Sequence, residues 1–101
     1  MPVMIVKHKV ADFKQWKTVF DSMNEVRGQH GWTAHEVYQK ADDPNFVTIV
    51  NHMRDIERAK AYGGSDALKT AMAKAGVQGP PEITFLNDAD SRLYRSTLTS
   101  F

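Results

Sequence analysis

Hydrophobic residues recur along the chain with two different spacings, and the spacing changes several times. Four short segments are rich in Val, Ile, Phe and Thr, which is typical of β-strands: residues 3–10, 32–40, 46–53 and 82–87. Two longer segments carry apolar residues at every third or fourth position, which predicts amphipathic helices from residue 13 to about 28 and from 56 to 75. The chain therefore runs strand, helix, strand, strand, helix, strand.

Residues that favour helix ends stand at the expected places. Asp12 and Asp55 precede the two helical segments, where an aspartate can accept a hydrogen bond from the first turn. Gln15 gives the first of these caps the spacing of a capping box. In the second segment a Gly-Gly pair interrupts the helix, Ser65 can start it again, and Gly76 can end it in the left-handed conformation.

The order of the elements and an internal repeat define the fold class. Residues 10–17 match residues 53–60, at a constant offset of 43, in apolar, capping and charged classes. Residues 42–45 contain Asp, Pro and Asn, which favour a tight turn between the second and third strands. The sequence therefore predicts an α+β domain of the ferredoxin-like βαββαβ type, with a four-stranded antiparallel sheet and two helices on one face.

The repeat also assigns side chains to the two faces of the sheet. One face, beneath the helices, is expected to hold Met4, Val6, His8, Ile49 and Asn51. The other face is also apolar, with Val3, Ile5, Val37, Phe46, Val50 and Leu86. Because the chain's own helices cannot reach that second face, we expect two copies to pack sheet against sheet, as a homodimer in the form of a dimeric α+β barrel.

Length and charge limit the classes of partner. With 101 residues the chain has the size of one domain, expected at residues 1–87, and residues 88–101 form a polar tail or an arm that crosses the dimer. The apolar anchors of that arm are Leu93, Tyr94, Leu98 and Phe101. A net charge of +1 argues against nucleic acid, and no apolar run reaches the roughly 20 residues of a membrane span. The first ten residues lack the order of a signal peptide, so the expected location is cytoplasmic.

Two polar residues interrupt the apolar face beneath the helices. His8 and Asn51 occupy equivalent positions in the two halves, and we take them as candidate catalytic residues, with His8 as a general base titrating near neutrality. Trp16 and Tyr62 can flank a planar substrate, and Tyr38 can contribute a phenol. Other interpretations stay open, because backbone or water can satisfy the polar pair and the aromatic residues can be plain core.

His35 and His52 are the pair to consider for a metal. A four-residue turn at 42–45 would place them opposite each other on the hairpin. A structural zinc site needs four ligands, however, the chain has no Cys, and Glu36 points to the opposite face from His35. We therefore expect no metal and no other cofactor.

Residues 62–69 (YGGSDALK) look like an aromatic-x-x-Ser-x-x-apolar-Lys element, and residues 1–87 resemble the dimeric α+β barrel superfamily. That superfamily includes antibiotic-biosynthesis monooxygenases, haem-degrading monooxygenases and small polyketide cyclases. The resemblance implies a cavity between sheet and helices. Haem-degrading members have a Trp where Tyr62 stands and a ligating His near Met72, so we expect no tight haem complex here. Many cofactor-free members carry a Trp where this chain has Met53.

Two functional interpretations follow from these residues. The first is a barrel protein that binds a small apolar or aromatic molecule and acts on it as a cofactor-free monooxygenase or cyclase, through His8, Asn51 and Tyr62. The second is a non-catalytic binding or stress-response module of the same fold, because neither catalytic pattern of the resembling proteins is reproduced. The sequence does not decide between an enzyme and a binding module.

Overall fold

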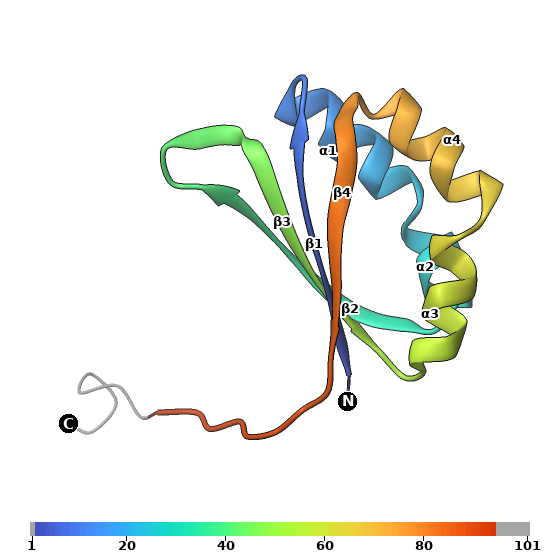
Figure 1. Ribbon diagram of the computed structural model, residues 1–101, viewed down its shortest axis with the longest axis vertical. Helices are drawn as coiled ribbons and strands as arrows, with labels where there is room; N and C mark the ends of the chain where they lie inside the picture. The colour runs from blue at the N-terminus through green and yellow to red at the C-terminus, as the bar shows by residue number, and fades with distance from the viewer. Residues whose placement is uncertain (1, 95–101) are drawn as a thin grey trace.

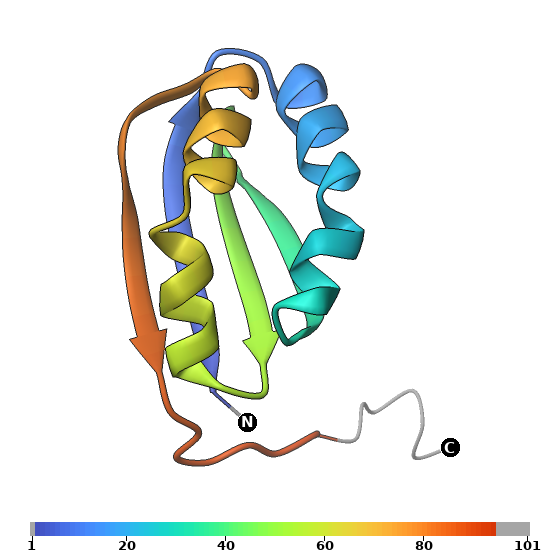
Figure 2. The same ribbon diagram turned by 90° about the vertical axis from the view of Figure 1, so that its right-hand side faces the viewer.

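The computed structural model describes residues 2–94 and shows one sheet covered by helices on a single face (Figures 1 and 2). The strands are β1 (Val3–Val10), β2 (Trp32–Lys40), β3 (Asp43–Met53) and β4 (Val77–Leu86). All pairs are antiparallel, in the order β2-β3-β1-β4. The helices are α1 (Phe13–Ser22), α2 (Asn24–Gln29), α3 (Ile56–Gly63) and α4 (Asp66–Lys74). The predicted ferredoxin-like α+β fold is confirmed, and no helix of the described residues is long and apolar enough to cross a membrane.

The two aspartate caps form as the internal repeat predicts. The Asp12 carboxylate accepts from the Gln15 backbone N–H at 3.0 Å, and the Asp55 carboxylate accepts from the Glu57 N–H at 2.9 Å. Both aspartates have extended backbone, with φ of −151° and −146°. The capping box is only half formed, because the Gln15 side chain donates to the Lys74 carbonyl at 3.4 Å. Gln15 therefore links α1 to the end of α4.

The first helical segment is broken where one helix was expected. Met23 leaves the helical range, with φ −101° and ψ 6°, and separates α1 from α2. A helix end leaves carbonyl groups without intrahelical partners. Here the Phe20 carbonyl accepts a side-chain hydrogen bond at 2.6 Å from Arg27, which reaches back from α2. The predicted break in the second segment is confirmed, and the Ser65 hydroxyl accepts from the Leu68 N–H at 3.2 Å.

The ends of two strands differ from the prediction. β3 begins at Asp43, so the hairpin turn shrinks to residues 41 and 42. β4 begins at Val77, well before the predicted start at residue 82, and so includes Gly79 and the two prolines that follow it. Proline is tolerated in this place because β4 is an edge strand. Between Lys7 and Lys9 the pairing of β1 with β4 shifts register, so that three β4 residues face the single residue His8.

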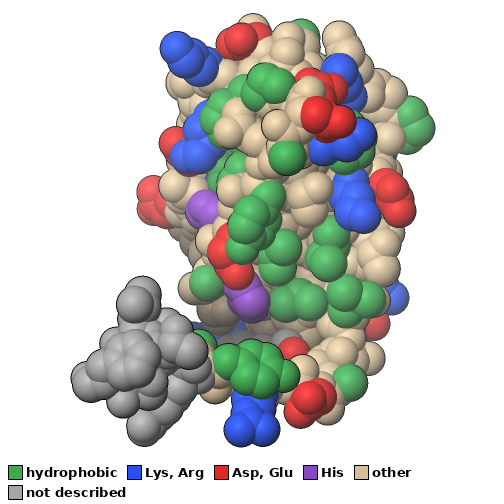
Figure 3. All heavy atoms as spheres, turned by 90° about the vertical axis from the view of Figure 1, so that its left-hand side faces the viewer, with side chains coloured by type: hydrophobic (Ala, Val, Ile, Leu, Met, Phe, Trp, Pro, Cys, Tyr) green, Lys and Arg blue, Asp and Glu red, His purple; other side chains and the backbone are tan. Residues whose placement is uncertain are grey.

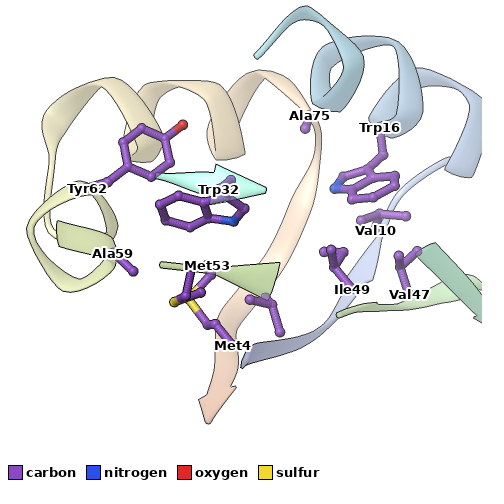
Figure 4. Packing of buried hydrophobic residues seen from close by; sticks show 11 residues of the cluster. Met4, Val10, Trp16, Trp32, Val47, Ile49, Met53, Ala59, Tyr62 and Ala75 are labelled. Atoms are coloured by element: carbon purple, nitrogen blue, oxygen red, sulfur yellow. The ribbon is translucent and has the colours of Figure 1, made fainter. Parts of the chain in front are cut away.

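The core lies between the helices and the sheet face beneath them (Figure 4). β1 and β3 contribute its central layer, as predicted: Met4, Val6, Val10, Val47, Ile49 and Met53. Trp16, Ala59 and Tyr62 cover this layer from the helices. Removing side chains of this size from water stabilises the fold by about 1.5 to 3 kcal/mol each.

The predicted face of β2 is wrong. Val37 pairs with Ile49 and is therefore on the helix face, although we expected it on the outer one. β2 carries register irregularities near both of its ends, one between Trp32 and Ala34 and one between Gln39 and Lys40. A slip of one residue turns every side chain of a strand to the opposite face, and a hydrophobic pattern does not reveal such a slip.

Gly76 is required at the end of α4, and a substitution tests this. Its φ is +75°, and an added Cβ would stand 3.4 Å from the Ala11 Cβ. We expect Gly76→Ala to lower the free energy of unfolding by about 1 to 2 kcal/mol, from the left-handed backbone alone. Gly28→Ala is the control, because nothing lies within 4 Å of its added Cβ and it is inside α2. Urea denaturation should show that variant unchanged or more stable, and an equally stable Gly76→Ala variant would contradict this account.

Candidate functional site

A cavity lies between the helices and the covered face of the sheet, with about 720 Å³ of empty space including its open mouth. All four strands and all four helices, with their end residues, contribute to its lining, which is mostly Met, Val, Leu, Ile and aromatic carbon. No acidic side chain is among its lining residues. The polar and aromatic residues that matter for chemistry are His8, Trp16, Arg27, Trp32, Asn51 and Tyr62.

His8 is on β1 and is only 6% exposed. Neither of its ring nitrogens has a hydrogen-bond partner in the described part of the chain. Its ring meets the Trp16 ring edge-on, with centroids 5.6 Å apart. Burial lowers the pKa of His8 from its ordinary value of 6.5. The ring is therefore neutral at pH 7, with one nitrogen that donates and one that accepts.

The strand next to His8, β4, is irregular where it faces this residue. Residues 79–81 of β4 stand opposite His8 in the register shift, and two of them are prolines, which have no backbone N–H for a ladder. Pro81 lines the cavity beside Ile83 of the same strand. Irregular strands of this kind commonly redirect side chains at functional sites. The sequence marked Gly79-Pro80-Pro81 only as a break before the last strand.

Asn51 is on β3, opposite Met4 and therefore four residues along β1 from His8, and it is 3% exposed. Its side-chain amide donates to the backbone carbonyl of Met4, its cross-strand partner, at 3.3 Å. This bond holds the amide in place. For Asn51 the hydrogen bond also agrees with the second interpretation of the sequence, in which the backbone satisfies the buried polar side chain.

Two groups of aromatic side chains enclose the cavity. On α1, Trp16 and Phe20 stack with centroids 4.8 Å apart and an interplanar angle of 23°. Beside α3, the rings of Trp32 and Tyr62 meet edge to face at 5.3 Å. Figure 4 shows the two indoles apart from each other, each with its nitrogen on the side that faces the other. A planar molecule can therefore contact aromatic carbon from both sides.

Further unsatisfied groups accompany His8 in this lining. The Trp32 indole N–H and the Tyr62 hydroxyl are buried and have no partner among the described residues. Burial raises the pKa of Tyr62, so its phenol stays protonated and can donate. A buried polar group left unsatisfied costs about 1 to 3 kcal/mol, and a bound molecule with oxygen atoms would recover part of that free energy.

Four of the five predicted site residues lie in this lining: His8, Asn51, Trp16 and Tyr62. Tyr38 does not, which corrects the prediction. It pairs with Thr48 on the outer face of the sheet and is 55% exposed, because β2 has the opposite phase from the one we expected.

Among the lining residues that sequence reasoning missed, two carry side-chain N–H groups, Trp32 and Arg27. The sequence assigned Trp32 only to a strand. Because the pairing register shifts between Trp32 and Ala34, alternation along the strand does not show which side of the sheet Trp32 is on. Trp16, Phe20, Met23 and Arg27 follow one another at spacings of four, three and four, which is the spacing of one buried helix face. A charged residue at such a position was the signal in the sequence that could have identified Arg27.

The histidine pair considered for a metal is not assembled. His35 pairs with Asn51, while His52 pairs with Ala34 and lies on the outer face. There the His52 ring nitrogen is 2.8 Å from the Glu36 carboxylate. The one-residue slip of β2 therefore also places the two imidazoles on opposite faces of the sheet. Within residues 2–94 no three His, Asp or Glu side chains converge as metal ligands.

Comparison with known proteins identifies the fold. No family model matches the sequence. A patatin-like phospholipase domain-containing protein of Coccidioides immitis (strain RS) is 23% identical over 91 residues, which span 89% of this chain but only 12% of that protein. Many solved structures share the fold, and the chain has the ferredoxin-like fold of antibiotic biosynthesis monooxygenases.

Three solved structures illustrate the likeness. SnoaB of Streptomyces nogalater, a cofactor-independent oxygenase, superposes with a TM-score of 0.74 at 10% identity, over 89% of this chain and 94% of its own. An antibiotic biosynthesis monooxygenase gives 0.69 at 9% identity, over 89% of this chain and 100% of its own. A conserved protein of Methanosarcina mazei Go1 gives 0.69 at 18% identity, over 88% of this chain and 94% of its own. At these identities the likeness establishes the fold and not the activity.

The buried His8 ring predicts a pH dependence of stability. The pKa of His8 in the folded protein lies below 6.5, so as the pH falls the unfolded chain takes up the proton before the folded protein does. The contribution of His8 to the free energy of unfolding is therefore fully present above pH 6.5 and is lost as the pH falls towards its pKa in the folded protein. Urea denaturation between about pH 7.5 and 5.5 should show a loss of stability that His8→Gln reduces. His35→Gln is the matched control, because His35 has the same direction of shift but is exposed. The His35→Gln variant should keep most of the dependence of stability on pH. If His8→Gln leaves that dependence unchanged, the burial of a neutral His8 is contradicted.

Proposed function

We propose that the cavity binds a small, mostly apolar aromatic molecule and that the protein acts on it as a cofactor-free monooxygenase or cyclase. The observation that carries this proposal is the neutral His8 ring, with both nitrogens unsatisfied, inside an apolar cavity between two aromatic groups. The fold shared with a cofactor-independent oxygenase supports the same class of chemistry. The residues that bind substrate are Trp16, Trp32 and Tyr62, and Asn51 helps to orient it.

The chemistry begins with a proton transfer. The accepting nitrogen of His8 takes a proton from an acidic C–H or O–H of the substrate, and the electron pair stays on the aromatic system. In a cyclase the carbanion formed from the C–H attacks a carbonyl carbon of the same molecule, the carbonyl oxygen becomes an alkoxide, and His8 returns the proton to that oxygen. In a monooxygenase dioxygen is the oxidant: a CH₂ group between aromatic rings becomes a carbonyl that holds one oxygen atom, and the second oxygen leaves as water with the two hydrogens. The Tyr62 phenol can donate to the oxygen on which charge develops.

A non-catalytic binding module is the second candidate, and one observation favours it. A general base is usually held in orientation by a third group, such as a carboxylate or a backbone carbonyl. The described residues supply no such partner to His8, and Asn51 is already bonded to the Met4 carbonyl. The cavity would then bind its molecule without transforming it.

Turnover distinguishes the two candidates. Purified protein is mixed with quinols, anthrones and haem in air, and absorbance is followed with time. If the protein is an enzyme, one aromatic class should be converted, and His8→Gln should lower kcat by about 100-fold or more, the usual contribution of a general base. His35→Gln is the control, because His35 is outside the cavity lining, and it should leave the rate unchanged. Binding without turnover, or turnover that survives His8→Gln, would contradict the catalytic role.

The outer face of the sheet supports a homodimer. Hydrophobic side chains gather in the middle of this face (Figure 3). The register places Val3, Ile5, Phe46, Val50 and Leu86 on it, while Val37 is on the other side. Charged residues surround this apolar centre, with Lys7 and Glu82 beside Ile5. Two such faces packed about a two-fold axis would bury the apolar centre of each.

The C-terminal segment fits an arm that crosses to a partner. After β4 the chain runs away from the sheet on the side opposite the helices (Figure 1). Leu93 and Tyr94 are 95% and 80% exposed in the single chain, which is costly for apolar side chains. The other two predicted anchors, Leu98 and Phe101, lie outside the described residues.

A charge placed in the apolar centre tests the dimer. Val50→Asp or Ile5→Asp should give monomer or aggregate, because each would bury an unpaired carboxylate between the two sheets. Lys14→Asp, on the exposed side of α1, should leave the assembly unchanged. Light scattering at about micromolar concentration should give twice the 11.4 kDa of one chain for the unmodified protein. A well-folded monomer at that concentration would overturn the homodimer.

A further inference from the structure

Arg27 is a buried charge at the mouth of the cavity. It is 7% exposed, on α2, at a position where the helical stripe calls for an apolar residue. Together with Trp32 it lines the main cavity and also a second, more open hollow at the surface. Arg27 therefore borders both the aromatic interior and the surface hollow.

The partners of Arg27 are all neutral. One of its terminal nitrogens, Nη2, donates to the Phe20 carbonyl and to the side-chain oxygen of Asn24. The guanidinium carbon lies 3.7 Å from the centre of the Phe20 ring. Both of these hydrogen bonds start from the same nitrogen, whereas a guanidinium group has five N–H donors in a planar fork. Nη1 and Nε take no part in these bonds and are not among the fully buried unsatisfied atoms of the described residues, so a bound molecule can reach them.

No carboxylate among the described residues is close enough to Arg27 to form an ion pair with it. The cavity lining contains no acidic side chain. Asp21, whose charge acts on Arg27, is exposed and bonded to Lys17 at 2.6 Å. Burial lowers the pKa of Arg27, but an arginine stays charged at neutral pH. A buried charge without a counter-ion is unfavourable and is usually compensated.

We infer that the natural ligand carries an anionic oxygen group, of the carboxylate type, and that Arg27 binds it. The aromatic part of the ligand would then lie between the Trp16 and Tyr62 groups, with its anionic end at the mouth. This inference rests on the proposed function, because it assigns the class of molecule that the same cavity takes. The planar fork of an arginine matches the two oxygens of a carboxylate.

The test compares two probes of nearly the same size and shape, the anionic 2-naphthoate and the neutral 2-naphthamide, by isothermal titration calorimetry. The wild type should bind the carboxylate about tenfold or more tightly than the amide, as expected for a charged hydrogen-bonded pair. Arg27→Gln should remove this preference by weakening naphthoate alone. Arg27→Lys keeps the charge and should retain part of the preference. Arg54→Gln, at an exposed residue outside the cavity lining, is the control and should behave as wild type.

Each outcome has one meaning. Equal binding of the two probes by the wild type would overturn the role of Arg27 while the cavity's function stands. Three results together would assign Arg27 only a structural role at the α1–α2 junction. The Arg27→Gln variant would bind neither probe, a folded Arg27→Lys variant would also lose the preference for naphthoate, and naphthoate binding to the wild type would not depend on salt. If the wild type binds neither probe, the proposed function fails and this inference fails with it. Circular dichroism of each variant establishes that it is folded.

Discussion

The antiparallel pairing of β1 with β3 is the constraint on which the rest of the structure depends. It places Met4, Val6 and His8 opposite Asn51, Ile49 and Val47 on one face, and the helices must cover that face. A slip of one residue would turn the core side chains of one of the two strands to the outer face, together with its polar residue. The repeated cap at Asp12 and Asp55 then starts each helical segment at the same distance from its strand.

The cavity exists because this cover is interrupted. Each helical segment breaks once, at Met23 and at Gly64, and β4 bulges beside His8. The space left between them is lined by apolar carbon but contains the His8 ring, the Trp32 N–H and the Tyr62 hydroxyl without partners. A core shaped only for stability would avoid such groups, since each costs free energy when left unsatisfied. This conflict between burial and hydrogen bonding is the main reason to assign binding to this place.

Much of this arrangement could be predicted from the sequence, for identifiable reasons. The faces of β1 and β3 followed from alternation and from the internal repeat, which is why His8 and Asn51 were found. Tyr38 was placed wrongly because the irregularities of β2 change its phase without changing its composition. Arg27 was overlooked because a charged residue on a helix is ordinarily solvated, although its spacing from Phe20 and Met23 is that of a buried position.

The proposed function depends on His8 being a neutral ring, without hydrogen-bond partners among the described residues, that a ligand contacts inside the cavity. The most direct measurement is nitrogen NMR of the histidine rings, with 1-naphthol added to the purified protein at neutral pH. We expect a neutral His8 ring whose nitrogen resonances shift on addition, together with contacts from the probe to Trp16 and Tyr62. A protonated His8 ring, or a probe that perturbs only the outer face of the sheet, would contradict it.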